Sequence, residues 1–369
     1  MGSEAMLAVG LMSGTSLDGV DAALIETDGE GHVRPIAFRS EPYSHDARRQ
    51  LREATALALA YDRPRPSPEI VAAAELVTRR HLLVVRQLLR DAGVVANQVA
   101  VVGFHGQTVA HRPDRGWTWQ IGDGAAMADA LGIAVIDDFR SADVAAGGQG
   151  APLLPVYHRA VAAGEGLPVA ILNLGGVANI SYLDEGALVA FDTGPANALV
   201  DDWMMAERGS PRDEDGALAA TGAVHRSVLD ALLDNPWFDL PPPKSLDRAD
   251  FTAQPARGLS AADGAATLTA FTAATVALAL DHLPARPRRL LVAGGGRHNA
   301  TMMAMIADAC ALPVEPVERL GADGDAVEAQ GFAYMAVRTL RGLPISFPGT
   351  TGVPVPTIGG CIHRPGKPT

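Results

Sequence analysis

One pattern of apolar runs and glycine turns occurs twice in the chain, and it constrains the fold more than any other feature. The first copy occupies residues 7–41 and the second residues 169–191. Each copy is an apolar run, a glycine-containing turn and two further apolar runs, and short apolar runs bounded by turn residues predict strands. Such self-similarity indicates an internal duplication. We therefore expect two antiparallel meanders, with strands at 7–11, 20–27 and 33–41 in the first and at 169–173, 180–183 and 188–191 in the second.

The remaining apolar periodicity predicts helices between and after these meanders. The uncharged stretch 265–280 is too short and too rich in threonine to span a membrane, so we expect a buried helix there. Helical spacing and proline punctuation indicate helices at 46–61, 67–92, 195–208, 215–233, 261–283, 299–311 and 323–341, with further strands at 99–104, 133–136 and 289–293.

The glycine-rich stretch 145–150 (AAGGQG) is the predicted hinge between two domains. A chain of 369 residues is long for one domain of ordinary size. We expect an N-terminal lobe at 1–145, a C-terminal lobe at 146–343, and a proline- and glycine-rich tail at 344–369 that packs back on a lobe.

Composition excludes several classes of partner and compartment. Thirty Lys and Arg residues against 42 Asp and Glu residues give a net charge of −12, whereas nucleic acid and anionic membranes select basic surfaces. The two cysteines, Cys310 and Cys361, are too few for a disulfide framework, and the N-terminal string MGSEAMLAVG lacks the basic and apolar regions of a signal peptide. We expect a cytoplasmic protein that acts on a small molecule, with neither nucleic acid nor a membrane as its partner.

Lysine is rare, because Lys244 and Lys367 are the two lysines among the 30 basic residues. Neither follows a glycine-rich strand-to-helix turn, which excludes the GxxxxGK phosphate loop. Neither lies in a VAIK-like strand, which excludes the protein-kinase arrangement. A protein of this composition that binds phosphates must hold them with backbone amides, hydroxyl groups and a metal ion.

Three glycine elements lie at the ends of predicted strands. The first turn, 12–21, offers backbone N–H groups and three hydroxyls to an anion, and its Asp18 could hold a hydrated Mg²⁺ near phosphate; an ordinary hairpin turn is an equal alternative. The second turn, 173–179, repeats this chemistry without a charge, so two hairpins facing across a cleft could clamp a polyphosphate. The third element, 294–299 (GGGRHN), precedes a helix whose N-terminus can face an anion, and its glycines can lie under a planar ligand.

These elements resemble the phosphate hairpins and adenosine motif of the actin, sugar kinase and Hsp70-type ATPases, a ribonuclease H-like α/β fold with two lobes around a cleft. The motifs extend from residue 10 to about residue 331, nearly the whole chain. The strings that are similar to those of the anhydro-N-acetylmuramic acid kinase family are GLMSGTSLDGVDAAL, GFHGQTVAHRP, ADVAAGGQGAPLLP, LNLGGVANIS, FDTGPANALVDDW and VAGGGRHN.

The resemblance implies a phosphotransferase with an alcohol acceptor that works in peptidoglycan recycling. Such enzymes open the 1,6-anhydro bond of 1,6-anhydro-N-acetylmuramic acid with water and transfer the γ-phosphoryl group of ATP to O6, giving N-acetylmuramate 6-phosphate and ADP. ATP and Mg²⁺ are the implied cofactors. Whether the protein forms a homodimer is left as an open question. The alternatives are a sugar kinase of the same fold without ring hydrolysis, and an ATP-driven chaperone or filament protein, for which we expect a peptide-binding module that the short tail does not supply.

The resemblance also assigns residues to the nucleotide. Asp18 is the expected Mg²⁺ contact, through water. The implied ATP-binding positions are Gly14, Thr15, Ser16, Leu17, Asp18, Gly19, Val20, Asp21, Asn173, Gly175, Gly176, Asn179, Gly294, Gly295, Gly296 and Asn299.

Asp192 matches the catalytic aspartate of the family. The implied chemistry needs a base that takes a proton from water near the anomeric carbon, and a carboxylate suits this role. Because Asp192 ends a predicted strand and precedes the helix predicted after Pro195, the alternative is that it caps that helix.

Polar residues near predicted strand ends supply the expected sugar site. Arg140 is the candidate for the lactyl carboxylate, because arginine binds carboxylates bidentately. For each of the residues taken singly, a structural hydrogen bond is an equal alternative. The expected sugar contacts are His105, Gln107, Thr108, Gln120, Asp123, Arg140, Asp143 and Gln149, with Pro195 and Asn197 added by the resemblance.

Lys244 and Glu328 lie in strings that match the family, and their roles stay open. Lys244 follows three prolines, and we expect a solvated loop lysine rather than one that reaches the cleft. For Glu328, the helix surface and the cleft rim are equal alternatives. Isolated histidines are expected at the surface or in satisfied core positions; these are His81, His111, His158, His225, His282 and His363.

Overall fold

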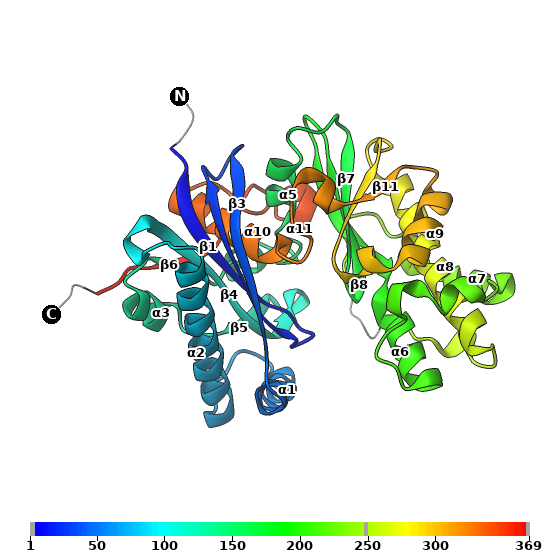
Figure 1. Cartoon of the computed structure of the whole chain (residues 1–369), viewed down its shortest axis with the longest axis horizontal. Coiled ribbons are helices and arrows are strands. Elements are labelled where there is room, and N and C mark those ends of the chain that lie inside the picture. Colours follow the sequence, from blue (N-terminus) through cyan, green and yellow to red (C-terminus); the bar gives the residue numbers. More distant parts are fainter. Residues whose placement is uncertain (1–3, 247–249, 367–369) are drawn as a thin grey trace. The chain divides into compact units, whose positions relative to one another are not determined.

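The computed structural model describes residues 4–246 and 250–366. The chain forms two compact units, and each is described by itself (Figure 1). The first unit combines Met1–Ala163 with Ala326–Thr369, and the second is Gly164–Asp325. The predicted boundary at 145/146 lies inside the first unit, which continues to Ala163. The predicted boundary at 343/344 differs because the last long helix belongs to the first unit.

A mixed sheet forms the centre of the first unit, with strand order β12-β6-β4-β1-β2-β3. Strands β1, β2 and β3 form the predicted antiparallel meander, and β4 and β6 lie parallel to β1 and to each other. Strand β5 pairs with β4, and β12 pairs with β6. The bounds are β1 Met6–Ser13, β2 Gly19–Thr27, β3 Val33–Pro42, β4 Val99–Arg112, β5 Trp117–Ile121, β6 Val135–Asp137 and β12 Cys361–His363.

Helices cover both faces of this sheet, because successive side chains of a strand point to opposite faces. On one face, Val9 and Leu11 of β1 belong to the apolar core that includes helices α1 (His45–Leu59) and α2 (Pro68–Asp91). Both helices begin as their sequences predict, since the hydroxyls of Ser44 and Ser67 accept hydrogen bonds from the first turns.

Helix α10 (Val327–Leu340) covers the other face, and two glycines of the sheet allow it to pack closely there. A Cβ atom on Gly10 of β1 would overlap the carbonyl oxygen of Ala329, and one on Gly103 of β4 would overlap that of Phe332. The helix backbone therefore lies directly on the two central strands. This contact assigns residues 326–343 to the first unit, which corrects the predicted C-terminal lobe.

The tail after α10 completes the first unit. Helix α11 (Pro348–Thr351) and strand β12 follow, and β12 adds an antiparallel edge to β6. Up to residue 366, the tail therefore packs on the first unit. Three shorter helices of this unit were not predicted: α3 (Gly124–Leu131), α4 (Ser141–Ala145) and α5 (Pro155–Val161).

The sheet of the second unit repeats the topology of the first, with strand order β11-β10-β7-β8-β9. Strands β7, β8 and β9 are an antiparallel meander, and β10 and β11 extend the sheet in parallel beside β7. The order 9-8-7-10-11 corresponds to 3-2-1-4-6, so the predicted duplication is confirmed. The bounds are β7 Val169–Leu174, β8 Val177–Leu183, β9 Leu188–Pro195, β10 Leu290–Ala293 and β11 Val314–Pro316.

Helices α6 (Asn197–Arg208), α7 (Arg226–Leu233), α8 (Ala261–Ala279) and α9 (Ala300–Cys310) pack in the second unit. The segment Ala261–His282 is long and apolar enough to cross a membrane by length and composition. Its 18-residue apolar window has a mean hydropathy of 1.4, but 72% of that window is buried. It is the core helix that the sequence predicts.

The predicted helix at 215–233 is wrong over its first half. Short 3₁₀ turns at Glu214–Gly216 and Ala219–Thr221 precede α7. Gly216 has a φ of 71°, in the left-handed region, and Gly222 lies so close to the carbonyl of Ala262 that a Cβ atom would overlap it. These two glycines interrupt the helix.

Candidate functional site

The first glycine turn joins β1 to β2 and presents two hydroxyls rather than three. Thr15 and Ser16 are exposed, but Ser13 is buried, and its hydroxyl donates to Oε1 of Gln107 at 2.5 Å and lies 3.0 Å from the hydroxyl of Tyr43. The expectation that all three hydroxyls face an anion is therefore wrong for Ser13. Tyr43 had no signal in the sequence that linked it to this turn.

The side chains of Leu17 and Val20 are buried in the core of the first unit. These two implied ATP-binding positions can offer a nucleotide only their backbone. Gly19 is required by a close approach, because a Cβ atom there would overlap the carbonyl of Glu41. Asp18 is exposed, and its own carbonyl accepts the backbone N–H of Tyr43 at 2.9 Å.

Strand β4 continues to Arg112, so His105, Gln107 and Thr108 lie inside a strand and not at its end. The reason is pairing with β5, which places Gln107 opposite Ile121 and Thr108 opposite Gln120. The predicted end at residue 104 was wrong because this partner is not evident in the local pattern.

Gln107 braces the first glycine turn. Its side chain is fully buried, its Nε2 donates to the carbonyl of Gly14 at 3.2 Å, and its Oε1 accepts the bond from Ser13. Both ends of the amide are used within the protein, so the geometry favours the structural alternative over a sugar contact.

Arg140 and His105 form a coupled pair. Nε of Arg140 donates to Nε2 of His105 at 3.1 Å, and Nδ1 of His105 lies 3.0 Å from the carbonyl of Gly106. Since Nε2 accepts, Nδ1 carries the proton and His105 is neutral. Burial holds the pKa of His105 well below its usual range, and the charge of Arg140 lowers it further. His105 therefore orients Arg140 from a buried position.

The guanidinium of Arg140 uses Nε and Nη1 in hydrogen bonds within the protein, which leaves Nη2 for a ligand. Nη1 donates to the carbonyl of Gly150 at 2.7 Å, whereas Nη2 makes no hydrogen bond with any residue in the described parts of the chain. Burial lowers the pKa of Arg140 to about 10, against the opposing charges of Glu328 and Asp143, so the side chain is still charged at neutral pH. An oriented cation of this kind suits a carboxylate.

Asp143 fixes the glycine-rich loop beside Arg140. It is buried, with Oδ1 accepting the backbone N–H of Gly150 at 2.6 Å and Oδ2 accepting the hydroxyl of Thr351 at 2.5 Å. The loop is also pinned by the bond from the backbone N–H of Gln149 to the carbonyl of Thr351. Asp143 thus has the structural role, and Gln149 is half-buried beside it.

Gln120 and Thr108 lie together, whereas Asp123 caps a helix. Nε2 of Gln120 donates to the hydroxyl of Thr108 at 3.1 Å across the β4–β5 pair. Oδ1 of Asp123 accepts the backbone N–H of Ala126 at 2.9 Å and so begins α3. The structure accounts for Asp123 without a ligand.

Glu328 lies in the first turn of α10, near Arg140 and Asp21. Burial raises the pKa of Glu328; Arg140 opposes this shift and Asp21 adds to it. The side chain is half-buried. In the first unit, the structure thus gathers Arg140, His105 and Glu328 into one polar cluster beside Asp21 of β2.

In the second unit, the second and third glycine elements lie in contact. A Cβ atom on Gly294 would lie 2.5 Å from Oδ1 of Asn173, and one on Gly296 would lie 2.5 Å from Cβ of Leu174. Nδ2 of Asn197 donates to the carbonyl of Leu174 at 2.9 Å. Gly294 and Gly296 therefore need to be glycine because their backbone is pressed against the end of β7, whereas a Cβ atom on Gly295 would meet no neighbour.

Arg297 and Asn299 hold the GGG element in place. Arg297 is buried and donates to Glu318 at 2.7 Å, to Asp325 at 2.8 Å and to the carbonyl of Gly294 at 3.1 Å. Burial opposes its charge, but the hydrogen bonds to Asp325 and Glu318 raise its pKa. Asn299 accepts the backbone N–H of Met302 and caps α9. Arg297 was missed although it lies inside the motif.

Asp192 lies on β9 opposite Asn179 of β8, next to the second glycine turn. Its backbone N–H donates to the carbonyl of Lys244 at 3.0 Å, and its Oδ2 accepts the backbone N–H of Leu246 at 2.8 Å. The alternative role as a helix cap is wrong, because α6 begins at Asn197 and Ala196 occupies its N-cap position. Pro195 is buried, and its carbonyl accepts the hydroxyl of Thr272.

Lys244 is buried, which contradicts the expectation of a solvated loop lysine. Nζ donates to the carbonyl of Phe238 at 2.7 Å and to that of Trp237 at 3.3 Å. Its ammonium is therefore satisfied by carbonyl groups. The second lysine, Lys367, lies outside the described residues.

The donor set fits a Mg²⁺ ion that arrives with a nucleotide rather than a protein-held metal. Within residues 4–246 and 250–366, no group of three His, Cys, Asp or Glu side chains could hold a metal. Mg²⁺ is typically bound by one or two carboxylates, water and substrate phosphates. The exposed carboxylate of Asp18 fits that requirement.

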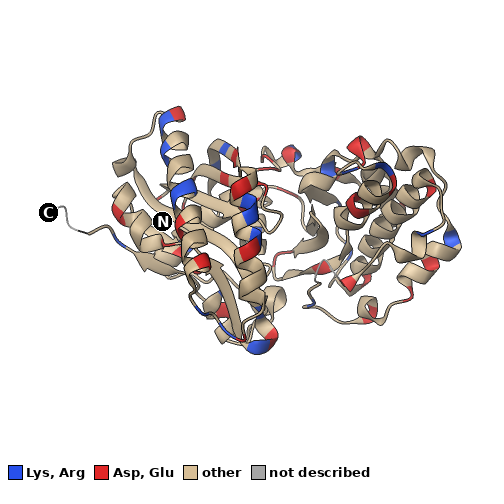
Figure 2. Cartoon of the chain, turned by 90° about the horizontal axis from the view of Figure 1, so that it is seen from below, with Lys and Arg blue, Asp and Glu red and all other residues tan. Residues whose placement is uncertain are grey.

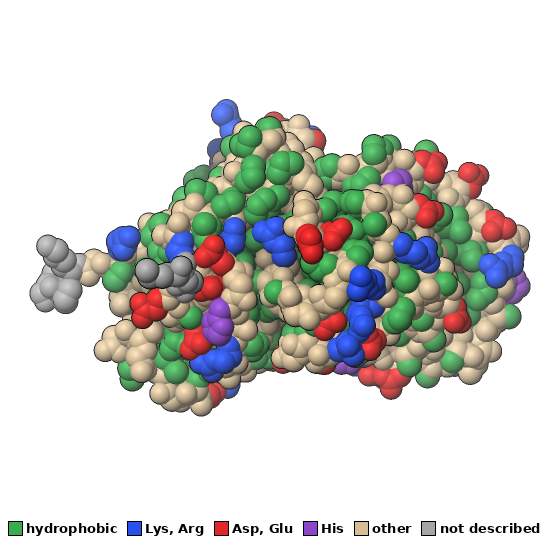
Figure 3. All heavy atoms as spheres, turned by 90° about the horizontal axis from the view of Figure 1, so that it is seen from above, with side chains coloured by type: hydrophobic (Ala, Val, Ile, Leu, Met, Phe, Trp, Pro, Cys, Tyr) green, Lys and Arg blue, Asp and Glu red, His purple; other side chains and the backbone are tan. Residues whose placement is uncertain are grey.

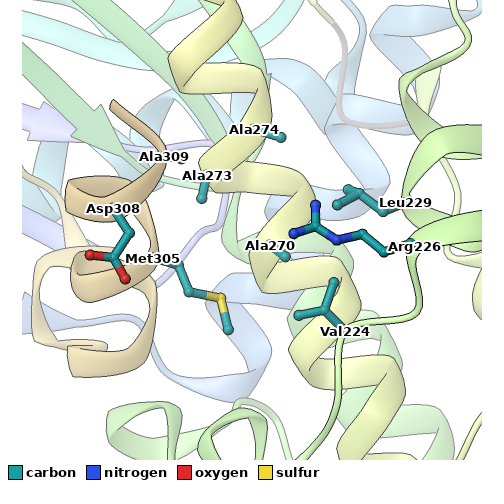
Figure 4. A pocket seen from close by; sticks show the side chains of 9 residues that line it. All are labelled: Val224, Arg226, Leu229, Ala270, Ala273, Ala274, Met305, Asp308 and Ala309. Carbon is teal, nitrogen blue, oxygen red and sulfur yellow. The ribbon is translucent and has the colours of Figure 1, made fainter. Parts of the chain in front are cut away.

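Positions of Lys and Arg and of Asp and Glu are distributed along each unit (Figure 2), and charged side chains of both signs are interspersed on the face drawn in Figure 3. The second unit also has a surface hollow of about 350 Å³, whose lining residues are drawn in Figure 4 and include no residue of the glycine elements. Alanines of α8 and α9 line it together with Arg226 and Asp308, and no predicted site residue is among its lining residues.

Comparison with known proteins gives a family. The family model described as anhydro-N-acetylmuramic acid kinase matches residues 6–365. The anhydro-N-acetylmuramic acid kinase of Rhizorhabdus wittichii is 74% identical over 362 residues, 98% of this chain and 99% of the relative. That of Zymomonas mobilis is 55% identical over 363 residues, 97% of this chain and all (100%) of the relative.

A solved structure shows the same fold at low identity. Component A of (R)-2-hydroxyglutaryl-CoA dehydratase from Acidaminococcus fermentans has a TM-score of 0.50 and is 10% identical, covering 91% of this chain and 99% of that one. The predicted α/β fold class with its duplicated strand meanders is confirmed.

Proposed function

The chain belongs to the anhydro-N-acetylmuramic acid kinase family, and we propose that it opens the 1,6-anhydro ring of 1,6-anhydro-N-acetylmuramic acid while it phosphorylates O6. The protein is thus a kinase that uses ATP. Coupled ring opening, Mg²⁺ and the residue roles that follow are parts of the proposal.

The proposed reaction balances without a further reactant. Water adds to C1 as Asp192 takes one of its protons, and the C1–O6 bond breaks. The electron pair of that bond stays on O6, which attacks the γ-phosphorus, and the bond from the γ-phosphorus to the bridging oxygen breaks to release ADP. The products are N-acetylmuramate 6-phosphate, ADP and one proton.

The observation that carries the proposal is the setting of Asp192. Asp192 pairs with Asn179, the last residue of the second glycine turn, and its Oδ2 accepts a backbone N–H at 2.8 Å. A hydrogen bond from an N–H group favours the ionised form of a carboxylate, which is the form that accepts a proton. The helix-cap alternative is excluded by the position of α6.

Backbone groups of the glycine elements support the nucleotide role. Lys244 is occupied by carbonyls and Arg297 by two carboxylates, so neither cation is available to a phosphate. The N–H groups and exposed hydroxyls of Thr15 and Ser16 are what the first turn offers an anion. Asp18 would hold Mg²⁺ through water, and Mg²⁺, when bound, neutralises charge on the phosphates.

Arg140 is assigned to the lactyl carboxylate of the sugar. Two of its nitrogens are fixed by His105 and Gly150, which orients the remaining one. We place the reaction in peptidoglycan recycling, from the chemistry of the substrate. We place it in the cytoplasm, because ATP is the second substrate and both cysteines are free thiols. A homodimer stays a prediction.

The test distinguishes coupled ring opening from simple phosphorylation. The protein is incubated with MgATP and 1,6-anhydro-N-acetylmuramic acid in ¹⁸O water, and the product is analysed by mass spectrometry. We expect one ¹⁸O atom at C1 and none in the phosphate on O6. Unlabelled N-acetylmuramate 6-phosphate in the same water corrects for exchange at C1. A phosphorylated sugar that keeps its anhydro ring, or ATP turnover that ignores the sugar, contradicts the proposal.

A further inference from the structure

Two backbone hydrogen bonds join Asp192 to one short segment, residues 244–246. The carbonyl of Lys244 accepts the N–H of Asp192 at 3.0 Å, and the N–H of Leu246 donates to Oδ2 of Asp192 at 2.8 Å. This segment contacts both the main chain and the carboxylate of the proposed base. Whatever fixes the segment therefore helps to orient that carboxylate.

The side chain of Lys244 fixes the segment to the 3₁₀ turn Pro236–Asp239. Nζ donates to the carbonyls of Phe238 (2.7 Å) and Trp237 (3.3 Å) and lies 4.5 Å from the centre of the Trp237 ring. In return, Nε1 of Trp237 donates to the carbonyl of Ser245 at 3.3 Å. The ammonium group and the indole thus cross-link the two segments.

The 3₁₀ turn is itself anchored in the core of the second unit. The Phe238 ring is buried and packs on Phe251 and Phe271, with ring centres 5.4 and 5.9 Å apart. The carbonyl of Phe238 also lies 2.9 Å from Nε2 of His282. A chain of contacts therefore leads from the aromatic core through Lys244 to Asp192.

We propose that Lys244 is a positioning residue for the base, holding the N–H of Leu246 on Oδ2 of Asp192 through its bonds to the carbonyls of residues 237 and 238. This inference rests on the proposed function, in which Asp192 is the base. Lys244 acts from a distance and touches no substrate. A buried ammonium is unfavourable unless it is hydrogen-bonded, and here carbonyls and an aromatic face satisfy it.

The segment is expected to affect both orientation and basicity. The Leu246 N–H favours the carboxylate form of Asp192 and restricts its rotamer. Loss of the bond leaves the carboxylate less easily ionised and less firmly held in its rotamer. The first change moves the acidic limb of the pH–rate profile to higher pH, and the second lowers kcat. A purely structural lysine would move neither in an enzyme that stays folded.

The central experiment measures kcat, KM and the pH profile of Lys244→Met, with Lys244→Arg as the conservative variant. For Lys244→Met we expect kcat to fall about 10- to 100-fold, as for a misplaced catalytic group, with KM for MgATP unchanged. We expect the acidic limb to move up by about half to one pH unit. Lys244→Arg keeps a cation with several donors and should restore part of kcat.

A second pair of variants keeps the inference testable if Lys244→Met does not fold. Leu246→Pro removes the N–H that Asp192 accepts, whereas Leu246→Ala keeps it and serves as the matched control. We expect the acidic limb to shift in Leu246→Pro but not in Leu246→Ala. An equal shift in both variants contradicts the inference.

Asp192→Asn separates this inference from the proposed function. If the wild-type protein does not phosphorylate the anhydro sugar, or if Asp192→Asn keeps full activity, the function or its base is wrongly assigned. If Asp192→Asn is inactive while folded Lys244→Met has an unshifted acidic limb and an unchanged kcat, the positioning role of Lys244 alone is overturned.

Discussion

Nε of Arg140 donates a hydrogen bond to Nε2 of His105, and the 3.1 Å contact joins a charged residue before α4 to a buried imidazole in β4. Because Nε2 accepts, His105 must be neutral, and its depressed pKa agrees with this. Arg140 is thereby fixed in one orientation with its charge retained. The pair has the form of a prearranged carboxylate receptor.

Arg140→Met is expected to reduce the response to the lactyl group of the sugar. Loss of charge-assisted hydrogen bonds worth about 1.5–3 kcal/mol corresponds to about a 10- to 100-fold fall in kcat/KM. Steady-state kinetics with 1,6-anhydro-N-acetylmuramic acid measure this. The analogue 1,6-anhydro-N-acetylglucosamine, which lacks the lactyl ether, is the control, and its kcat/KM should change little. A similar loss with both sugars would show that Arg140 does not recognise the carboxylate.

Asp192→Asn is expected to remove turnover and to spare nucleotide binding. General-base catalysis contributes about 10²- to 10⁴-fold, so kcat should fall by that factor. The affinity for MgADP, measured by isothermal titration calorimetry, should stay close to wild type. Asp184→Asn, at the far end of the same β8–β9 hairpin, is the matched control and should keep its activity. Retained turnover in Asp192→Asn would place the base elsewhere.

Asp18→Asn is expected to weaken the use of Mg²⁺. Outer-shell partners of a metal typically change its affinity by about 10- to 100-fold, so the Mg²⁺ concentration for half-maximal rate should rise by at least the lower factor. A Mg²⁺ titration at saturating ATP measures this. Asp46→Asn, which removes an exposed carboxylate from α1, should leave the curve unchanged. Superimposable curves for Asp18→Asn and wild type would remove Asp18 from the metal site.

His81→Leu is expected to make the protein less sensitive to acid. His81 is buried beneath Phe104, and burial lowers its pKa to about 4 from an ordinary value of 6.5. Between these values the unfolded chain binds more protons than the folded one, so the free energy of unfolding falls as pH falls through this window. For one such histidine the loss between pH 7 and pH 5 is about 2 kcal/mol.

Urea unfolding at pH 7 and pH 5 measures this difference. The loss of stability between the two pH values should be smaller by about 2 kcal/mol in His81→Leu than in wild type. His158, whose pKa burial lowers to about 3, should still contribute in the variant. His45→Gln changes an exposed histidine and should behave as wild type. An unaltered pH dependence in His81→Leu would show that His81 is not kept neutral by folding.

Local patterns predict the parts of this fold that depend on near neighbours. The two meanders, the glycine turns and helices α1, α2 and α8 all follow from apolar spacing and from turn or proline residues close by in the sequence. The same pattern assigns Asp192 to the last strand of the second meander, although β9 continues beyond it to Pro195. Each of these features is determined by residues close to it in the sequence.

The predictions are wrong where a segment distant in the sequence determines the local structure. Strand β4 extends through His105 to Arg112 because β5 supplies a partner, and the sequence up to residue 112 does not reveal it. The hydroxyl of Ser13 is unavailable to an anion because it is hydrogen-bonded to Gln107 and Tyr43. Lys244 is buried because the 3₁₀ turn before it turns two carbonyls toward its ammonium. In each case the deciding contact is tertiary.

The packing of α10 on Gly10 and Gly103 also has a consequence for synthesis of the chain. The second unit is one continuous stretch, whereas the first is closed by residues that follow it. A ribosome therefore finishes the second unit while one face of the first sheet still lacks its helix. Until α10 is synthesised, the face of β1 and β4 around Gly10 and Gly103 is exposed to solvent. The first unit can therefore complete its core only after its C-terminal residues have been made.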